Sequence, residues 1–147
     1  MNHAEYLVDL VDQNGTVVGS KQRQDINKVT DLYHTVFVIL RTPNNELILS
    51  KIPDRKDLPN LYSGRIGSTA ATIRRHDETP DEASLRAVKS ELLIDDIQLT
   101  HLNDAYYELP DGHKKYMSVY YGVHTVPEDF SRTDIESLVT FGRDELN

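Results

Sequence analysis

The carboxylate of Glu91 is not explained by an ordinary ion pair along a helix. It falls within a helix predicted over residues 80–93, and no cation occupies the positions three or four residues away. One carboxylate can support a weak Mg²⁺ site when substrate phosphates and water complete the coordination. A solvated surface glutamate would give the same pattern, so both interpretations stay open.

A local positive cluster surrounds the charged loop that follows Ile52. Its members are Lys51, Arg55, Lys56 and Arg65, in a chain whose formal net charge is −8. Cations grouped in this way could steer an anionic ligand toward the loop. A solvated loop has the same composition, and the sequence does not separate these two interpretations.

Composition limits the classes of protein that this chain can belong to. Its 147 residues, 38% hydrophobic and 27% charged, predict a single domain over residues 1–147. The acidic balance argues against a broad nucleic-acid-binding face. No apolar run or leader signal is present, so we expect no membrane partner and a cytoplasmic location. The absence of cysteine excludes disulfides, thiolate nucleophiles and cysteine-based metal sites.

Alternating hydrophobic residues and turn signals predict a chain built mostly of strands. A first hairpin turns at Asn14 and Gly15, and the helix begins with Thr79 as its cap and Glu82 closing a capping box. The remaining predicted strands cover residues 33–41, 47–52, 97–108, 114–124 and 137–141, with irregular short strands near 66 and 70–73. The tyrosines of the hairpin over 97–124 could stack on a nucleobase, but cross-strand packing would look the same.

Residues 74–94 resemble the Nudix box, whose pattern is Gly-x5-Glu-x7-Arg-Glu-U-x-Glu-Glu-x-Gly-U, with U an aliphatic residue. Counting from Glu78, the seven-residue gap ends at Arg86, and Val88, Glu91 and Ile94 take three of the later places. The resemblance covers nearly the whole chain. Residues 5–19 and 56–63 look like segments of the branch that contains isopentenyl diphosphate isomerase, and residues 136–146 look like the usual closing strand and helix start.

This resemblance implies an α/β/α sandwich with a central mixed sheet. It implies Mg²⁺-dependent hydrolysis of a nucleoside-diphosphate-linked substrate, with Mn²⁺ as a possible substitute. It implies that Glu91 binds the metal. It also implies that Glu78 and Arg86 form a bridge between loop and helix that orients the metal ligands. The implied substrate-binding residues are Lys51, Arg55, Lys56, Tyr62 and Arg65.

The chain departs from the box pattern at several places. Two of the box glutamates are Ala87 and Ser90 here, which leaves Glu91 without its usual carboxylate neighbours and predicts a weakly bound metal. Four positions that carry glycine in the family are Ala71, Thr72, Asp77 and Leu93. We therefore expect a weak or specialised hydrolase. The alternative is a catalytically inactive module with the Nudix fold that binds a nucleotide or a protein.

Three further features bear on these two hypotheses. Arg74, Arg75 and His76 replace small residues in the box loop, where they could block the site or supply new phosphate contacts. The absence of cysteine argues against isomerase activity, because those enzymes use an active-site thiol. Residues 144–147 provide about one helical turn where relatives carry a full helix, so a partner subunit in a homodimer could cover the gap.

Overall fold

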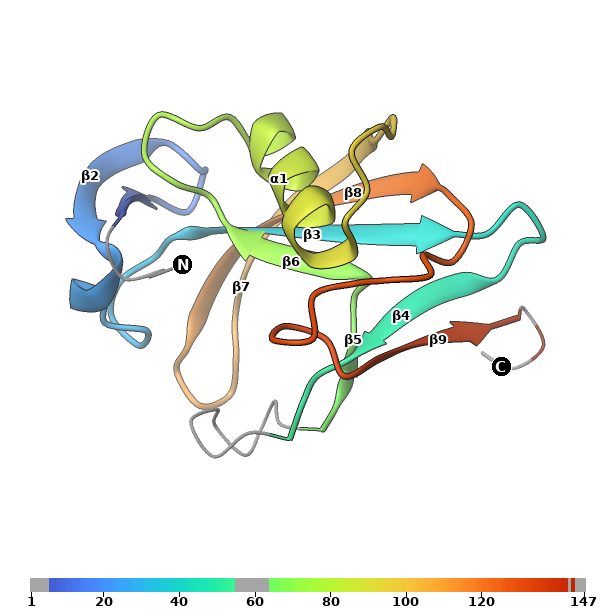
Figure 1. Ribbon diagram of the computed structural model, residues 1–147. Coiled ribbons are helices and arrows are strands. Elements are labelled where there is room, and N and C mark those ends of the chain that lie inside the picture. Colours follow the sequence, from blue (N-terminus) through green and yellow to red (C-terminus); the bar gives the residue numbers. More distant parts are fainter. Residues whose placement is uncertain (1–5, 55–63, 143, 145–147) are drawn as a thin grey trace.

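The computed structural model describes residues 6–54, 64–142 and 144 (Figure 1). The predicted hairpins, helix and closing strand are all present, and a short 3₁₀ helix, η2, is an element that the sequence did not predict. In chain order the elements are β1 (Leu7–Val11), β2 (Val17–Gln22), η2 (Arg23–Asp25), β3 (His34–Arg41), β4 (Leu47–Lys51), β5 (Ile66–Gly67), β6 (Ala70–Ile73), α1 (Pro80–Leu92), β7 (Thr100–Glu108), β8 (Lys114–Val123) and β9 (Ser137–Phe141).

A seven-stranded sheet has β3 near its centre, and β1 and β2 form a separate two-stranded sheet. Strand β3 pairs parallel with β8 and antiparallel with β4 and β6, which makes the larger sheet mixed. Within the described residues α1 is the only α-helix, and it packs against β3 and β6 on one face of the sheet (Figure 1). The predicted α/β fold with a central mixed sheet is confirmed.

The core lies between α1 and the sheet. Val36, Val38 and Leu40 alternate along β3 and are completely buried, as expected for a strand whose one face meets the helix. Buried Thr69 joins three strands: it accepts a hydrogen bond from the Leu40 N–H at 2.8 Å and donates to the Ile48 carbonyl. This side chain holds β4 and the start of β6 against β3, and these two strands line the cavity described below.

The start of α1 follows the sequence prediction, and the helix ends at Leu92, one residue before the predicted end. The Glu82 N–H donates to Thr79 Oγ1 at 3.1 Å, and the Thr79 N–H donates to Glu82 Oε1 at 3.0 Å, which completes the capping box. At 13 residues α1 is too short to cross a bilayer, and no other described helix meets the length and hydropathy that a membrane span needs.

Two of the replaced glycine positions adopt a backbone conformation that glycine favours. Asp77 has φ 62° and Leu93 has φ 57°, so both lie in the left-handed region on either side of α1. The other two, Ala71 and Thr72, are part of β6, where a side chain fits without strain. The fold therefore retains the backbone geometry of the glycine pattern and carries strain at two of its four positions.

We expect Leu93→Gly to raise the free energy of unfolding by about 0.5–1 kcal/mol, because it relieves the left-handed strain at an exposed residue. Chemical denaturation measures this change. Leu85→Gly, at an exposed position inside α1, is the matched control and should lower the same free energy by about 1 kcal/mol. A lower free energy of unfolding in Leu93→Gly than in wild type would contradict the claim that the backbone of Leu93 is strained.

Candidate functional site

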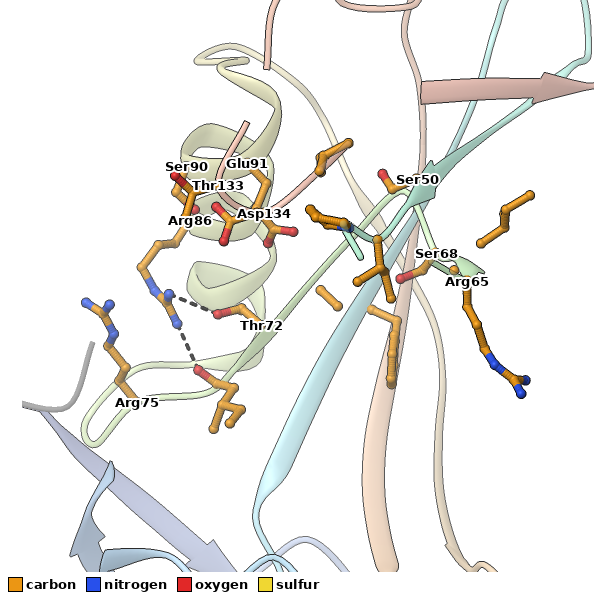
Figure 2. Close-up of a pocket in the computed structure, with 18 of the residues that line it drawn as sticks. Ser50, Arg65, Ser68, Thr72, Arg75, Arg86, Ser90, Glu91, Thr133 and Asp134 are labelled. Atoms are coloured by element: carbon orange, nitrogen blue, oxygen red, sulfur yellow. Dashed lines mark hydrogen bonds between the residues drawn. The ribbon is translucent and has the colours of Figure 1, made fainter. Parts of the chain in front are cut away.

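A cavity of about 710 Å³ opens between α1, β4, β5, β6 and the loop before β9 (Figure 2). Phe37, Ile52 and Ile66 provide part of an apolar wall, and polar groups stand on either side of it. The charged residues of the lining are Arg23, Arg65, Arg75, Arg86, Glu91 and Asp134. The cavity thus combines an apolar surface with four cations and two carboxylates, which suits an anionic ligand that has an organic part.

Glu91 projects from the last turn of α1 into this cavity. The Ala71 backbone N–H donates a hydrogen bond to its carboxylate. Burial, reinforced by the nearby Asp134 carboxylate, raises the pKa of Glu91 to about 8. Because Glu91 is only partly exposed and lines a cavity, it is not the freely solvated surface glutamate of the alternative interpretation.

Asp134 is a second carboxylate at the same end of the cavity (Figure 2). Its loop is fastened to α1 because the Ser131 N–H donates to the Glu91 carbonyl at 2.8 Å. Ser131 Oγ also donates to Asp134 Oδ2 at 2.8 Å, and buried Ile135 anchors the end of the loop in the core. Sequence reasoning missed Asp134, since its loop has no periodic or motif signal and reaches Glu91 only through the tertiary fold.

Arg86 ties α1 to the preceding loop and to β6. Its Nε and Nη2 donate to the two carboxylate oxygens of Glu78 at 2.7 and 3.0 Å. Its remaining donors reach Thr72 Oγ1 at 3.0 Å and the Ile73 carbonyl at 2.9 Å (Figure 2). Although burial opposes the effect, the Arg86 hydrogen bonds and a backbone N–H hold the pKa of Glu78 below its usual value. The structure brings Glu78 and Arg86 together as a bridge between loop and helix.

Of the three consecutive residues Arg74, Arg75 and His76, two contact the same carboxylate and one points into the cavity. Arg74 is largely buried, and its Nη2 lies 3.7 Å from Asp9 Oδ2, while Asp9 Oδ1 accepts a hydrogen bond from His76 Nδ1 at 2.7 Å. Arg75 instead lines the cavity and stacks over the Tyr6 ring, with its guanidinium carbon 4.2 Å from the ring centre. Only Arg75 of the three therefore faces the site.

The residues predicted to bind substrate have different positions. Arg65 is exposed and lines the cavity on the side away from Arg75 (Figure 2). Lys51 lies outside the lining and pairs with Glu136 at 2.9 Å. Arg55, Lys56 and Tyr62 lie outside the described residues.

The tyrosines of the β7–β8 hairpin are absent from the lining of this cavity. Tyr116 and Tyr120 are buried, and the Tyr120 hydroxyl donates to Asp81 on α1. Tyr116 packs edge-on against His34 with ring centres 4.9 Å apart. These two side chains serve packing between the sheet and its neighbours, as the structural interpretation of the sequence expected.

Comparison with known proteins finds matches among solved structures, and these matches establish the fold of the chain. No protein-family model and no curated protein sequence matches the chain. A solved Deinococcus radiodurans protein matches with a TM-score of 0.77 at 21% identity, over 95% of this chain and 85% of that chain. A MutT Nudix hydrolase from Burkholderia pseudomallei matches with a TM-score of 0.63 at 20% identity, over 79% and 87%. The dihydroneopterin triphosphate pyrophosphohydrolase of E. coli matches with a TM-score of 0.56 at 15% identity, over 72% and 77%.

The chain has the Nudix fold. The two positions at which the resemblance to the Nudix box implies a glutamate, Ala87 and Ser90, have different surroundings. Ala87 is completely buried in the core beneath α1, whereas Ser90 is exposed and lines the cavity beside Glu91. A carboxylate at residue 90 would therefore face the site, and one at residue 87 would enter the apolar core.

We expect Ser90→Glu to bind Mg²⁺ about tenfold more tightly than the wild type, because it adds an oxygen ligand and a negative charge next to Glu91. Isothermal titration calorimetry with MgCl₂ measures the affinity. Ala87→Glu should instead lower the free energy of unfolding by about 3–5 kcal/mol, since its charge would be buried without a partner. Equal Mg²⁺ affinity in Ser90→Glu and wild type would contradict this placement of residue 90.

The raised pKa of Glu91 also predicts how stability depends on pH in metal-free buffer. The folded state binds this proton more tightly than the unfolded state, so Glu91 lowers the free energy of unfolding as pH rises from about 4.5 to about 8. Glu91→Gln removes this titration and should gain stability relative to wild type over that interval. Urea denaturation with EDTA at several pH values measures the difference, with Glu128→Gln, at an exposed glutamate, as the control. If the free energies of unfolding of Glu91→Gln and wild type differed by the same amount at every pH, Glu91 would not be desolvated.

Proposed function

We propose that this protein hydrolyses a diphosphate-containing small molecule, of the nucleoside-diphosphate-linked class, with Mg²⁺ or Mn²⁺ as a weakly held cofactor. The observation that carries the proposal is the Glu91 carboxylate, which lines a cavity beside Asp134 and forms no ion pair within the described residues. A desolvated carboxylate next to a second one is unfavourable unless a proton or a cation neutralises it.

The donor set fits one weakly bound divalent cation. Glu91 and Asp134 offer carboxylate oxygens, which Mg²⁺ prefers, and Mg²⁺ often takes only one or two carboxylates together with substrate phosphates and water. Within the described residues no group of three or more His, Asp or Glu side chains could hold a metal ion. When bound, the metal would neutralise phosphate charge and lower the pKa of a water molecule that attacks phosphorus.

Other residues of the chain would position Glu91, bind phosphate oxygens or contact the organic part of the substrate. Glu78 and Arg86 are positioning residues, because they fix α1 against β6 and so hold Glu91 next to the Ala71 N–H. Arg65 offers a cation for phosphate oxygens at one side of the cavity. The apolar wall that includes Phe37 and Ile52 offers a surface for the organic part of the substrate.

The comparisons support this class of reaction through the names of two structural neighbours. One is called a MutT Nudix hydrolase, and the other a pyrophosphohydrolase of dihydroneopterin triphosphate. The missing carboxylates at Ala87 and Ser90 favour a second candidate, a module with the Nudix fold that binds a nucleotide without turnover. The two candidates differ in one measurable property, which is metal-dependent hydrolysis.

We expect a panel of nucleoside diphosphates, nucleoside triphosphates, dinucleotide polyphosphates and nucleotide sugars to contain a substrate in the presence of Mg²⁺ or Mn²⁺. Glu91→Gln should lower turnover of that substrate by a factor on the order of 100 or more, because the isosteric amide cannot hold the metal. Phosphate release or chromatography of the products measures the rate. Glu128→Gln, at an exposed residue outside the cavity lining, controls for the loss of one acidic group.

The panel has two contrary outcomes. Equal rates in wild type and Glu91→Gln would remove Glu91 from the reaction and assign the rate to a contaminant or another site. No turnover of any compound, together with binding of the same compounds, would replace the hydrolase by the binding module.

A further inference from the structure

The guanidinium of Arg75 lines the cavity, and within the described residues one of its buried donors has no hydrogen-bond acceptor. Its central carbon lies over the Tyr6 ring, 4.2 Å from the ring centre. Its Nε is buried and has no hydrogen-bond partner, and the side chain makes no ion pair within the described residues. Since a buried donor that lacks an acceptor is unfavourable, a structure that keeps one at a cavity wall is suited to a ligand that brings the acceptor.

The charges around Arg75 leave this end of the cavity positive. Glu78 accepts the Arg75 backbone N–H at 3.0 Å, but its two carboxylate oxygens are already bound by Arg86. Arg23, from η2, lines the same cavity and likewise makes no ion pair within the described part of the chain. In the part of the chain that the structure describes, Glu78 is the carboxylate paired with the group of cations formed by Arg23, Arg75 and Arg86, so this end of the cavity attracts anions.

Arg75 and Glu91 lie at different places along the cavity. Arg75 and Arg86 share Glu78 as a partner, and Glu91 follows Arg86 by five residues, a rise of about 7.5 Å along α1. The Arg86 side chain extends away from Glu91, toward the loop that carries Arg75 (Figure 2). A phosphate group that faces Glu91 therefore leaves Arg75 free for a further anionic group.

We propose that Arg75, oriented by Tyr6 and assisted by Arg23, binds an additional phosphate group of the ligand, beyond the diphosphate at Glu91. This proposal rests on the proposed function only in taking the scissile diphosphate to lie at Glu91. A stacked guanidinium presents its N–H donors in one plane and so matches two phosphate oxygens at once. Arg75 therefore selects ligands with a longer phosphate chain, and it does not block the site.

Inorganic tripolyphosphate and pyrophosphate are the probes for this subsite, with affinity measured by isothermal titration calorimetry in EDTA. Wild type should bind tripolyphosphate at least about tenfold more tightly than pyrophosphate, and Arg75→Ala should remove most of that difference. Arg75→Lys keeps the charge but not the planar fork, so it should recover only part of the preference.

Three control variants separate stacking and net charge from the recognition itself. Tyr6→Phe keeps the ring under Arg75 and should bind like wild type, whereas Tyr6→Leu should resemble Arg75→Ala. Lys89→Ala removes a positive charge from an exposed position of α1 outside the cavity and should leave both affinities unchanged. Equal weakening in Lys89→Ala and Arg75→Ala would reduce the effect to net charge and overturn the proposal.

The outcomes for the subsite and for hydrolysis are independent. Unchanged or tighter tripolyphosphate binding in Arg75→Ala would show that Arg75 blocks the cavity. If Arg75→Ala lowered the affinities for tripolyphosphate and pyrophosphate by the same factor, Arg75 would not select for the length of the phosphate chain. Either result overturns the subsite while Glu91-dependent hydrolysis could still stand. Conversely, tripolyphosphate binding that depends on Arg75, in a protein without hydrolytic activity, would confirm the subsite and refute the proposed function.

Discussion

The bidentate contact between Arg86 and Glu78 is the interaction on which the site depends. It joins α1 to its entry loop, while the other donors of the same guanidinium hold β6. Because β6 presents the Ala71 N–H to Glu91 and the loop presents Arg75 to the cavity, one side chain sets the positions of both. A partly buried guanidinium whose three nitrogens all donate hydrogen bonds has little freedom, which makes it a suitable anchor for a site assembled from separate elements.

The chain has the Nudix fold, but α1 carries fewer acidic side chains than the resemblance to the Nudix box implies. Ala87 extends the hydrophobic core, and Ser90 leaves a small polar group where a carboxylate would reach the cavity. Asp134 contributes a carboxylate from the loop before β9, and Arg75 contributes a cation from the loop before α1. In the proposed function, charged groups from loops therefore supplement the single glutamate that α1 brings to the cavity.

Local signals predicted the fold well, because they operate within one element. The Thr79 and Glu82 capping box and the alternation along β3 act between near neighbours in sequence, and both are confirmed. The surroundings of Glu91 could not be predicted in this way, since a helix pattern shows only residues three or four positions away. Asp134, Tyr6 and Arg23 reach the cavity through tertiary packing, and the direction in which Arg75 points is decided by the ring of Tyr6.

The protonation of Glu91 with and without metal tests most directly whether this carboxylate is the metal ligand of the cavity. Carbon-13 NMR of the labelled glutamate carboxyls, with Glu91→Gln to assign the signal, follows this one group across pH. We expect it to titrate near pH 8 in EDTA, and at a clearly lower pH when Mg²⁺ and a non-hydrolysable diphosphonate are present. A titration near 4.5 that Mg²⁺ does not change would contradict both its burial and its role as a metal ligand.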